Sequence, residues 1–328
     1  MSKPVIGLID IDGKMPNLAL MKISAEYKRW GYAVEFVRPE VQYSRYKRIY
    51  ASAIFTASKE KIETLRQHYG RKIIFGGTGV NTYTKLALEY ACRKPDYDLY
   101  TAEMLAPKMR GPYKAATRLE KAKHIVNAGI GFTSRGCIRN CPFCFVPEKE
   151  GEFRQDSEIR DIINPRSNRI ILLDNNLTAD PYCIDKLQEI KERDLIVDIT
   201  QGLDVRLMTP EKAQALASVR HEGRLHYSWD LMNQEAAVME GIQTLSAFIR
   251  PWKQTCYVLV GFDTNFEEDT YRVRKLAEMG ISPYVMIYNQ RKDDRLLHHF
   301  AGWVNGRVYK KCSFEDYEPW IKEREAVV

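Results

Sequence analysis

Strand-type and helix-type segments alternate over the last two thirds of this 328-residue chain, and this alternation limits the folds that it can adopt. The strand candidates are short runs rich in β-branched and aromatic residues, at residues 125–133, 169–173, 196–200, 225–229, 254–260 and 282–288. Helix candidates lie between them, at residues 181–193, 210–219, 234–247 and 267–279. Repeats of about 30 residues, each a strand followed by a helix, predict a partial (β/α)6 TIM barrel.

The first third of the chain alternates in the same way on a smaller scale. Its strand candidates are residues 5–10, 33–37, 49–56 and 72–75, and its helix candidates are residues 17–30 and 59–69. This order predicts an α/β domain with a Rossmann-like, doubly wound parallel sheet.

These patterns predict four parts. Residues 1–95 form the Rossmann-like domain, and residues 96–122, which include Pro107 and Pro112, form a linker. Residues 123–290 form the partial barrel, and residues 291–328 form a C-terminal extension that closes one end of it.

Charge is distributed unevenly between these parts. Residues 1–127 hold 23 Lys and Arg against 12 Asp and Glu, whereas the remainder holds 27 against 31. A basic first domain indicates an anionic partner such as nucleic acid, and a solvated lysine-rich surface is the alternative. The candidate contact residues are three cations and three interleaved tyrosines: Arg45, Lys47, Arg48, Tyr43, Tyr46 and Tyr50. Tyrosine rings can stack on unpaired bases, and the alternative is that they pack on the domain.

Neither export nor membrane insertion is indicated by the apolar segments. Asp10 and Asp12 interrupt the N-terminal apolar run, and no window approaches ~18 uncharged apolar residues. We therefore expect a cytoplasmic location and no membrane partner. Four of the seven cysteines are isolated in sequence, which argues against a disulfide framework and predicts small buried side chains: Cys92, Cys183, Cys256 and Cys312.

The other three cysteines lie within eight residues, directly after the first barrel strand. Cys137, Cys141 and Cys144 form a C-x3-C-x2-C pattern. Three thiolates on one loop can bind three irons of a [4Fe–4S] cluster and leave the fourth iron open. Structural zinc is the alternative, but zinc usually takes four ligands in two pairs, and no second His or Cys pair follows nearby.

At this motif the chain resembles the radical S-adenosylmethionine (SAM) enzymes, whose hallmark is CxxxCxxC with an aromatic residue before the last cysteine. Phe143 has that position. The resemblance extends across roughly residues 125–290. Residues 171–178 are similar to the "DDNFT"-type second strand of the branch that has an N-terminal cobalamin-binding domain. Residues 258–263 resemble the fifth strand of the same branch.

The resemblance implies a [4Fe–4S] cluster on the three cysteines and reductive cleavage of SAM to a 5′-deoxyadenosyl radical. That radical would abstract hydrogen from a substrate, and an external electron donor of the flavodoxin or ferredoxin type would supply the electron. The SAM-binding candidates that it implies are Phe143 near the adenine, Asp174, Asn175 and Asn176 at the amino end, and Gln201, Asp204 and Arg206 for the ribose or carboxylate. For each polar residue the alternative is an ordinary loop cap.

Cobalamin is a further cofactor that the resemblance raises. The branch binds it through the histidine of a DxHxxG motif, but Asp10, Asp12 and Gly13 stand in the loop after the first strand, without a histidine. The glycine-rich residues 76–79 would approach its phosphate-bearing tail, although glycine also suits any tight turn. Histidine-off binding leaves cobalamin open, and a repurposed Rossmann-like domain that binds substrate is favoured.

We predict an enzyme of the radical SAM type that modifies an unknown substrate, either nucleic acid or peptide. A cobalamin-dependent radical SAM C-methyltransferase is the first alternative. The second is a non-catalytic nucleic-acid-binding protein with a structural metal site.

Overall fold

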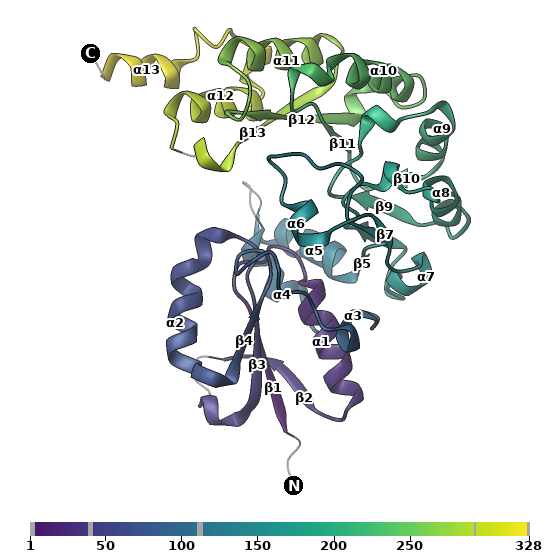
Figure 1. Cartoon of the computed structure of the whole chain (residues 1–328), viewed down its shortest axis with the longest axis vertical. Helices are drawn as coiled ribbons and strands as arrows, with labels where there is room; N and C mark the ends of the chain where they lie inside the picture. The colour runs from purple at the N-terminus through teal and green to yellow at the C-terminus, as the bar shows by residue number, and fades with distance from the viewer. Residues whose placement is uncertain (1–3, 39–41, 110–113, 292, 327–328) are drawn as a thin grey trace. The chain divides into compact units, whose positions relative to one another are not determined.

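The computed structural model describes residues 4–38, 42–109, 114–291 and 293–326, and it is an α/β structure built on parallel strands (Figure 1). The chain divides into two units. Unit 1 comprises residues 1–136 and 145–171, and unit 2 comprises residues 137–144 and 172–328. Pro112 of the predicted linker lies outside the described residues, as do the first three residues of the predicted first domain and the last two of the predicted extension.

Unit 1 contains a four-stranded parallel sheet. Its strands are β1 (Val5–Asp10), β2 (Ala33–Phe36), β3 (Tyr46–Ser52) and β4 (Ile73–Gly76), in the order β2-β1-β3-β4. Helices α1 (Leu18–Arg29) and α2 (Lys59–Tyr69) lie on opposite sides of the sheet (Figure 1). Val5 and Ile6, which point to opposite faces of β1, are both buried, as expected for a parallel sheet with both faces covered.

The predicted boundaries in this sheet are accurate to within one residue except at β3. Residues 5–10 and 59–69 form a strand and a helix with the expected bounds. β3 covers Tyr46–Ser52 rather than residues 49–56. It begins at Tyr46 because the backbone there pairs with Val5 of β1 and the Tyr46 ring is buried in the core. Asn17 caps α1, where its side chain accepts a hydrogen bond from the Leu20 N–H at 3.2 Å.

The tyrosines proposed to stack on nucleic acid are mostly core residues. Tyr46 and Tyr50 are buried, and the Tyr50 hydroxyl lies 2.7 Å from that of Tyr27. The stacking hypothesis is therefore wrong for these two residues, and packing on the domain is the correct alternative. Two of the cations also have partners: Arg45 pairs with the Glu35 carboxylate at 3.1 Å, and Lys47 donates to the Tyr32 hydroxyl at 2.7 Å.

The glycine-rich residues 76–79 pack against the backbone that follows β3. Gly77 has φ +96°, and a Cβ added to it would lie 2.1 Å from the Ala53 carbonyl oxygen. The Gly79 N–H donates to the same oxygen at 2.9 Å. These glycines thus have a structural role in close backbone packing.

Asp12, in the loop after β1, binds the backbone that follows β3. Its carboxylate accepts hydrogen bonds from the N–H groups of Ile54 (2.7 Å) and Phe55 (3.0 Å) and from the Ser58 hydroxyl (2.7 Å). Asp12, which lies in the loop where the DxHxxG motif would belong, is therefore part of the hydrogen-bond framework of unit 1.

The described part of unit 1 contains five further α-helices between residues 88 and 162, four of them only four or five residues long. They are α3 (Leu88–Ala91), α4 (Ala102–Leu105), α5 (Ala115–Asn127), α6 (Val146–Glu150) and α7 (Ile159–Ile162). The strand predicted from residue 125 is wrong at its start, because α5 continues to Asn127 and β5 is confined to Gly129–Gly131. Ala122 and Val126 are buried at helical spacing, so this β-branched stretch belongs to a helix. A short antiparallel pair, β6 (Ser134–Arg135) and β7 (Arg154–Gln155), follows.

Unit 2 continues the alternation of strands and helices. From β8 (Arg169–Leu172), which leads into it, the strands are β9 (Ile196–Ile199), β10 (Arg220–His221), β11 (Leu225–Ser228), β12 (Gln254–Val260) and β13 (Ser282–Ile287). The helices are α8 (Cys183–Glu192), α9 (Pro210–Ser218), α10 (Glu235–Ser246), α11 (Phe266–Glu278), α12 (Arg295–Asn305) and α13 (Glu318–Ala326). Parallel pairing joins β11, β12 and β13 in that order, and β9 pairs with β10. The predicted strands and helices between residues 169 and 288 are all present, whereas β10 was not predicted.

The two faces of these strands differ in burial. Tyr227, Cys256 and Val258 lie on one face and are almost completely buried. Alternate residues point the other way, and of these Tyr284 and Met286 are exposed. This face of the β11-β12-β13 sheet is therefore open at β13, whereas Thr255 of β12 is buried on it. Within the described chain, no helix combines the length and apolar character needed to cross a membrane.

Candidate active site

The three cysteines of the motif lie on one loop of unit 2. This loop, residues 137–144, follows Gly136, which has φ +79°. A Cβ on Gly136 would lie 2.3 Å from the Glu152 carbonyl oxygen, so only glycine fits before the loop. The Cys144 N–H donates to the Cys141 carbonyl at 3.0 Å, which closes a tight turn between the last two cysteines.

Two N–H donors point at the sulfur of Cys137. They are the backbone N–H of Arg139 and the side-chain amide of Asn176, each 3.4 Å from Sγ. The Asn176 Oδ1 accepts hydrogen bonds from the Ala179 N–H (3.2 Å) and the Thr178 hydroxyl (3.0 Å). Because its oxygen is engaged in this way, the amide presents its NH₂ group to the sulfur, where it would stabilise a thiolate.

Asp204 joins the loops that follow β8 and β9 to the cysteine loop. Its carboxylate accepts a hydrogen bond from Arg139 Nε at 2.9 Å and two from Arg206, at 2.6 and 3.0 Å. Its own N–H donates to the Thr178 hydroxyl at 2.8 Å. The side chain is 6% exposed, so these charge-assisted bonds are shielded from water. Asp204 is therefore an anchor for the cysteine loop.

The ionisation of Asp204 follows from these contacts. Burial alone would raise the pKa of its carboxyl, but the hydrogen bonds from Arg206 and Arg139 outweigh burial and hold the pKa below its usual value. The carboxylate form is thus favoured in the folded protein.

This shift predicts a pH-dependent stability difference. At pH 7 we expect Asp204→Asn to lower the free energy of unfolding by about 2 kcal/mol, since asparagine loses the charge-assisted bonds. A depressed folded-state pKa contributes stability above the unfolded value of about 3.9, and that contribution disappears as pH falls through the folded value. Urea unfolding of both proteins from pH 7 to pH 3 should show the difference closing below about pH 4. The exposed Asp263 provides the control Asp263→Asn, which should match the wild type throughout. A gap of constant size down to pH 3 would contradict this account.

Arg206 also lies within electrostatic range of the cysteine loop. Burial raises the pKa of the Cys141 thiol, and the positive charge of Arg206 partly offsets this effect. The loop therefore combines a half-buried thiol with a neighbouring guanidinium, a setting that favours bound negative charge.

On the other side of the loop, aromatic rings pack together. The Phe143 ring meets the Phe262 ring edge to face, with centroids 5.3 Å apart, and Phe262 meets Tyr288 in the same way at 5.0 Å. Phe262 follows β12 and Tyr288 follows β13. The strand ends thus provide an apolar wall beside the cysteine loop.

A buried arginine ties the ends of two neighbouring strands together. Arg272 of α11 is completely buried, and its guanidinium donates to the carbonyls of Trp229 (2.7 Å), Asp230 (2.9 Å) and Leu259 (2.8 Å). It also forms an ion pair with the buried Asp269. These bonds satisfy carbonyls at the carboxyl ends of β11 and β12 and hold the loops beyond them in place.

The structure brings some predicted site residues together and not others. Asn176, Asp204 and Arg206 share one network with the cysteine loop, as described above. Asp174 is buried and Asn175 half-buried after β8, whereas Gln201 is exposed in the turn after β9.

Sequence reasoning missed Arg139, Thr178 and Phe262 as members of the site. Arg139 occupies a spacer position of the cysteine motif, where residue type carries no signal. Phe262 lies in a segment singled out for its resemblance, but without a role.

The chemistry of the donor set suits an iron–sulfur cluster. None of the three thiols forms a disulfide; Cys137 and Cys141 are half-buried and Cys144 is exposed. Within the described residues, no three His, Cys, Asp or Glu side chains lie close enough together to bind one metal ion. In a cubane cluster each thiolate binds a different iron, so the ligands need not converge on one point as zinc ligands do.

Comparison with known proteins adds little to this geometry. No protein-family model matches the chain, and no curated protein matches its sequence. Among solved structures it is similar to Streptococcus suis SuiB bound to the precursor peptide SuiA, with a TM-score of 0.39 and 13% sequence identity. The similarity covers 60% of this chain and 53% of the SuiB chain, so it spans about half the length of that protein.

Proposed function

We propose that this chain is a radical SAM enzyme in which Cys137, Cys141 and Cys144 hold a [4Fe–4S] cluster. The observation that carries the proposal is the loop of three cysteines at the carboxyl ends of the unit 2 strands, anchored there by Asn176 and Asp204. Barrel-type α/β enzymes place their chemistry at this end of the strands. In this proposal residues 123–290 form a partial barrel and residues 1–95 form a Rossmann-like domain.

When bound, the cluster and SAM would supply a one-electron reduction that cleaves SAM to a radical able to take hydrogen from a substrate. The chain's own residues stabilise and position the cysteine loop. Asn176 stabilises the thiolate of Cys137 through its amide, and Asp204 keeps Arg139 and Arg206 beside the loop.

The aromatic wall and the buried polar residues would receive SAM itself. Phe143 and Phe262 would offer apolar edges to a flat base, and Asp174 and Asn175, which follow β8, would contact the amino end. SAM bound in this way would exclude water from the reacting centre.

The open face of the unit 2 sheet is our proposed substrate surface. The His226 ring stacks on Tyr257 with centroids 5.5 Å apart, and Tyr257 meets Tyr284 at 5.7 Å. These side chains lie on β11, β12 and β13, whose carboxyl ends lead to the candidate site. Tyr46 and Tyr50 are core residues, so the excess positive charge of residues 1–127 is what favours a nucleic-acid substrate. A peptide is the second candidate substrate.

The test is SAM cleavage under strictly anaerobic conditions. We expect the reconstituted, dithionite-reduced protein to release 5′-deoxyadenosine from SAM even without its substrate, measured by chromatography and mass spectrometry. Cys144→Ala should release none. The prediction that Cys92 is buried is wrong, because this cysteine is exposed. It lies away from the motif, so Cys92→Ala should behave as the wild type. A wild-type protein that contains its full complement of iron and sulfide but produces no 5′-deoxyadenosine would contradict the proposal.

A further inference from the structure

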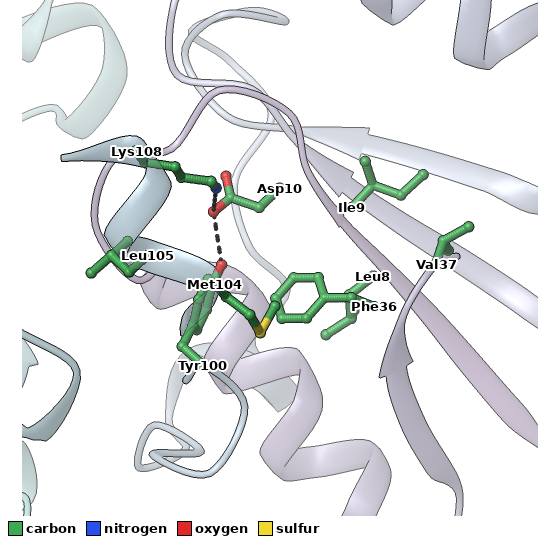
Figure 2. A pocket seen from close by; sticks show the side chains of 9 residues that line it. All are labelled: Leu8, Ile9, Asp10, Phe36, Val37, Tyr100, Met104, Leu105 and Lys108. Carbon is green, nitrogen blue, oxygen red and sulfur yellow. Dashed lines mark hydrogen bonds and ion pairs between the residues drawn. The ribbon is translucent and has the colours of Figure 1, made fainter. Parts of the chain in front are cut away.

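Unit 1 contains a cavity of about 210 Å³ at the carboxyl ends of β1 and β2 (Figure 2). Ligands of open α/β sheets bind at the carboxyl ends of their strands, so the location is suited to binding. The volume exceeds the ~150 Å³ of a cavity that accepts benzene, yet is below the ~300 Å³ at which drug-sized pockets begin. It therefore suits a small molecule with one ring or a branched aliphatic group.

One side of the cavity is polar and carries a buried carboxylate. The Asp10 side chain is 3% exposed, and its oxygens accept hydrogen bonds from the Gly13 N–H (2.9 Å), the Tyr100 hydroxyl (3.0 Å) and Lys108 Nζ (3.4 Å). Figure 2 shows the last two contacts as dashed lines. A carboxylate offers about four acceptor positions, so these three bonds leave capacity for one more donor.

Lys108 also retains capacity for a ligand. Its ammonium group has three donors, and among the described residues its hydrogen-bond acceptor is Asp10, at a long 3.4 Å. The side chain is 36% exposed, so the ammonium can move from Asp10 to a ligand at little cost in packing. The cavity thus presents an anion and a cation next to each other.

The remaining lining is apolar. Leu8 and Leu105 are buried in the wall, and Phe36 packs edge to face on Tyr100 with centroids 5.0 Å apart. Met104, which is 39% exposed, is a soft and adaptable side chain at the cavity. This wall suits a branched aliphatic or aromatic group, because burying such a group against it removes apolar surface from water.

We propose that this cavity binds a free α-amino acid with an apolar side chain. The ligand's carboxylate would accept from Lys108, its ammonium would donate to Asp10, and its side chain would fill the apolar wall. A zwitterion matches the adjacent pair of opposite charges, whereas an amine or an acid satisfies one of them. The proposal is independent of the radical SAM proposal, since the lining residues belong to unit 1 and include none of the cysteines.

Calorimetric titration of the full-length protein with L-leucine and L-phenylalanine tests this inference. Two analogues complete the set: isoamylamine is leucine without its carboxylate, and 4-methylpentanoate is leucine without its ammonium. We expect an amino acid to bind and each analogue to bind about 10- to 100-fold more weakly, because each loses a charge-assisted hydrogen bond.

Variants at the exposed lining residues connect this selectivity to the cavity. Lys108→Met should weaken leucine binding about 10- to 100-fold and remove the preference for leucine over isoamylamine. Met104→Trp should fill the cavity and abolish binding of both amino acids and both analogues. Lys59→Met, at an exposed lysine of α2, is the matched control and should bind as the wild type. Asp10 is avoided because replacing a buried carboxylate puts folding at risk, and melting temperatures verify that the variants fold.

The proposal is overturned if neither amino acid binds at millimolar concentration or if either analogue binds as tightly as leucine. Equal weakening by Lys59→Met and Lys108→Met would place the binding outside this cavity and overturn it as well.

Discussion

Cys141→Ala should leave the reconstituted protein without the proposed iron–sulfur cluster, which is the largest single effect that we expect in this chain. Three thiolates must together hold the three protein-bound irons, and the loop has no spare donor, because the remaining cysteines are isolated in sequence. Iron and acid-labile sulfide per chain, together with the visible absorption of the cluster, should fall to background.

Two further variants separate ligation from a general effect on the loop. Asn176→Leu keeps the three thiols and the Arg139 N–H donor but removes the side-chain N–H donor to Cys137, so the cluster should still form but at a shifted reduction potential. Cys92→Ala should retain the wild-type iron content. Full iron and sulfide content in Cys141→Ala would rule out the assignment of the three cysteines, whatever the activity of the protein.

Arg272→Met should produce the largest loss of stability. It removes three hydrogen bonds to strand-end carbonyls and leaves the Asp269 carboxylate buried without its cation. Breaking a buried ion pair from one side costs about 3–5 kcal/mol, a large share of the ~5–15 kcal/mol by which a typical domain is stable. Four of the five tryptophans belong to unit 2, so urea unfolding followed by tryptophan fluorescence reports mainly on this unit.

The matched control uses an ion pair on the surface. Arg193 pairs with Glu189 on α8, with both side chains partly exposed, and Arg193→Met should cost no more than about 1 kcal/mol. If the two variants unfold at the same urea concentration, Arg272 does not stabilise the strand ends as described.

Periodicity predicted the elements of unit 2 well, because its strands are covered by helices on one face and carry strong β-branched runs. Residues 254–260 became β12 with the same bounds, and the neighbouring helices differ by one or two residues at their ends. The prediction failed at residues 125–127, where Ile125 and Val126 favour a strand locally. Here the buried spacing of Ala122 and Val126 places these residues in α5 instead.

The site was predictable only where chemistry limits the residue type. Thiolates bind iron whatever surrounds them, so the three cysteines were evident as candidates. Arg139 and Thr178 were not, because an arginine or a threonine in a loop has many uses and only the folded chain shows Asp204 beside both. The stacking prediction for Tyr46 and Tyr50 was wrong for a different reason: a role was assigned where there is none. A tyrosine between cations looks like a base-stacking residue until its burial is known.

The division of the chain has a consequence for any attempt to dissect the protein. The eight residues that carry all three cysteines pack with unit 2, yet unit 1 precedes and follows them in sequence. A fragment that ends at residue 171 would contain every proposed iron ligand but neither Asn176 nor Asp204, whereas the complementary fragment would contain those supports and no ligand. Neither half therefore contains the complete proposed centre, and limited proteolysis between residues 144 and 172 should inactivate the protein only if the pieces separate.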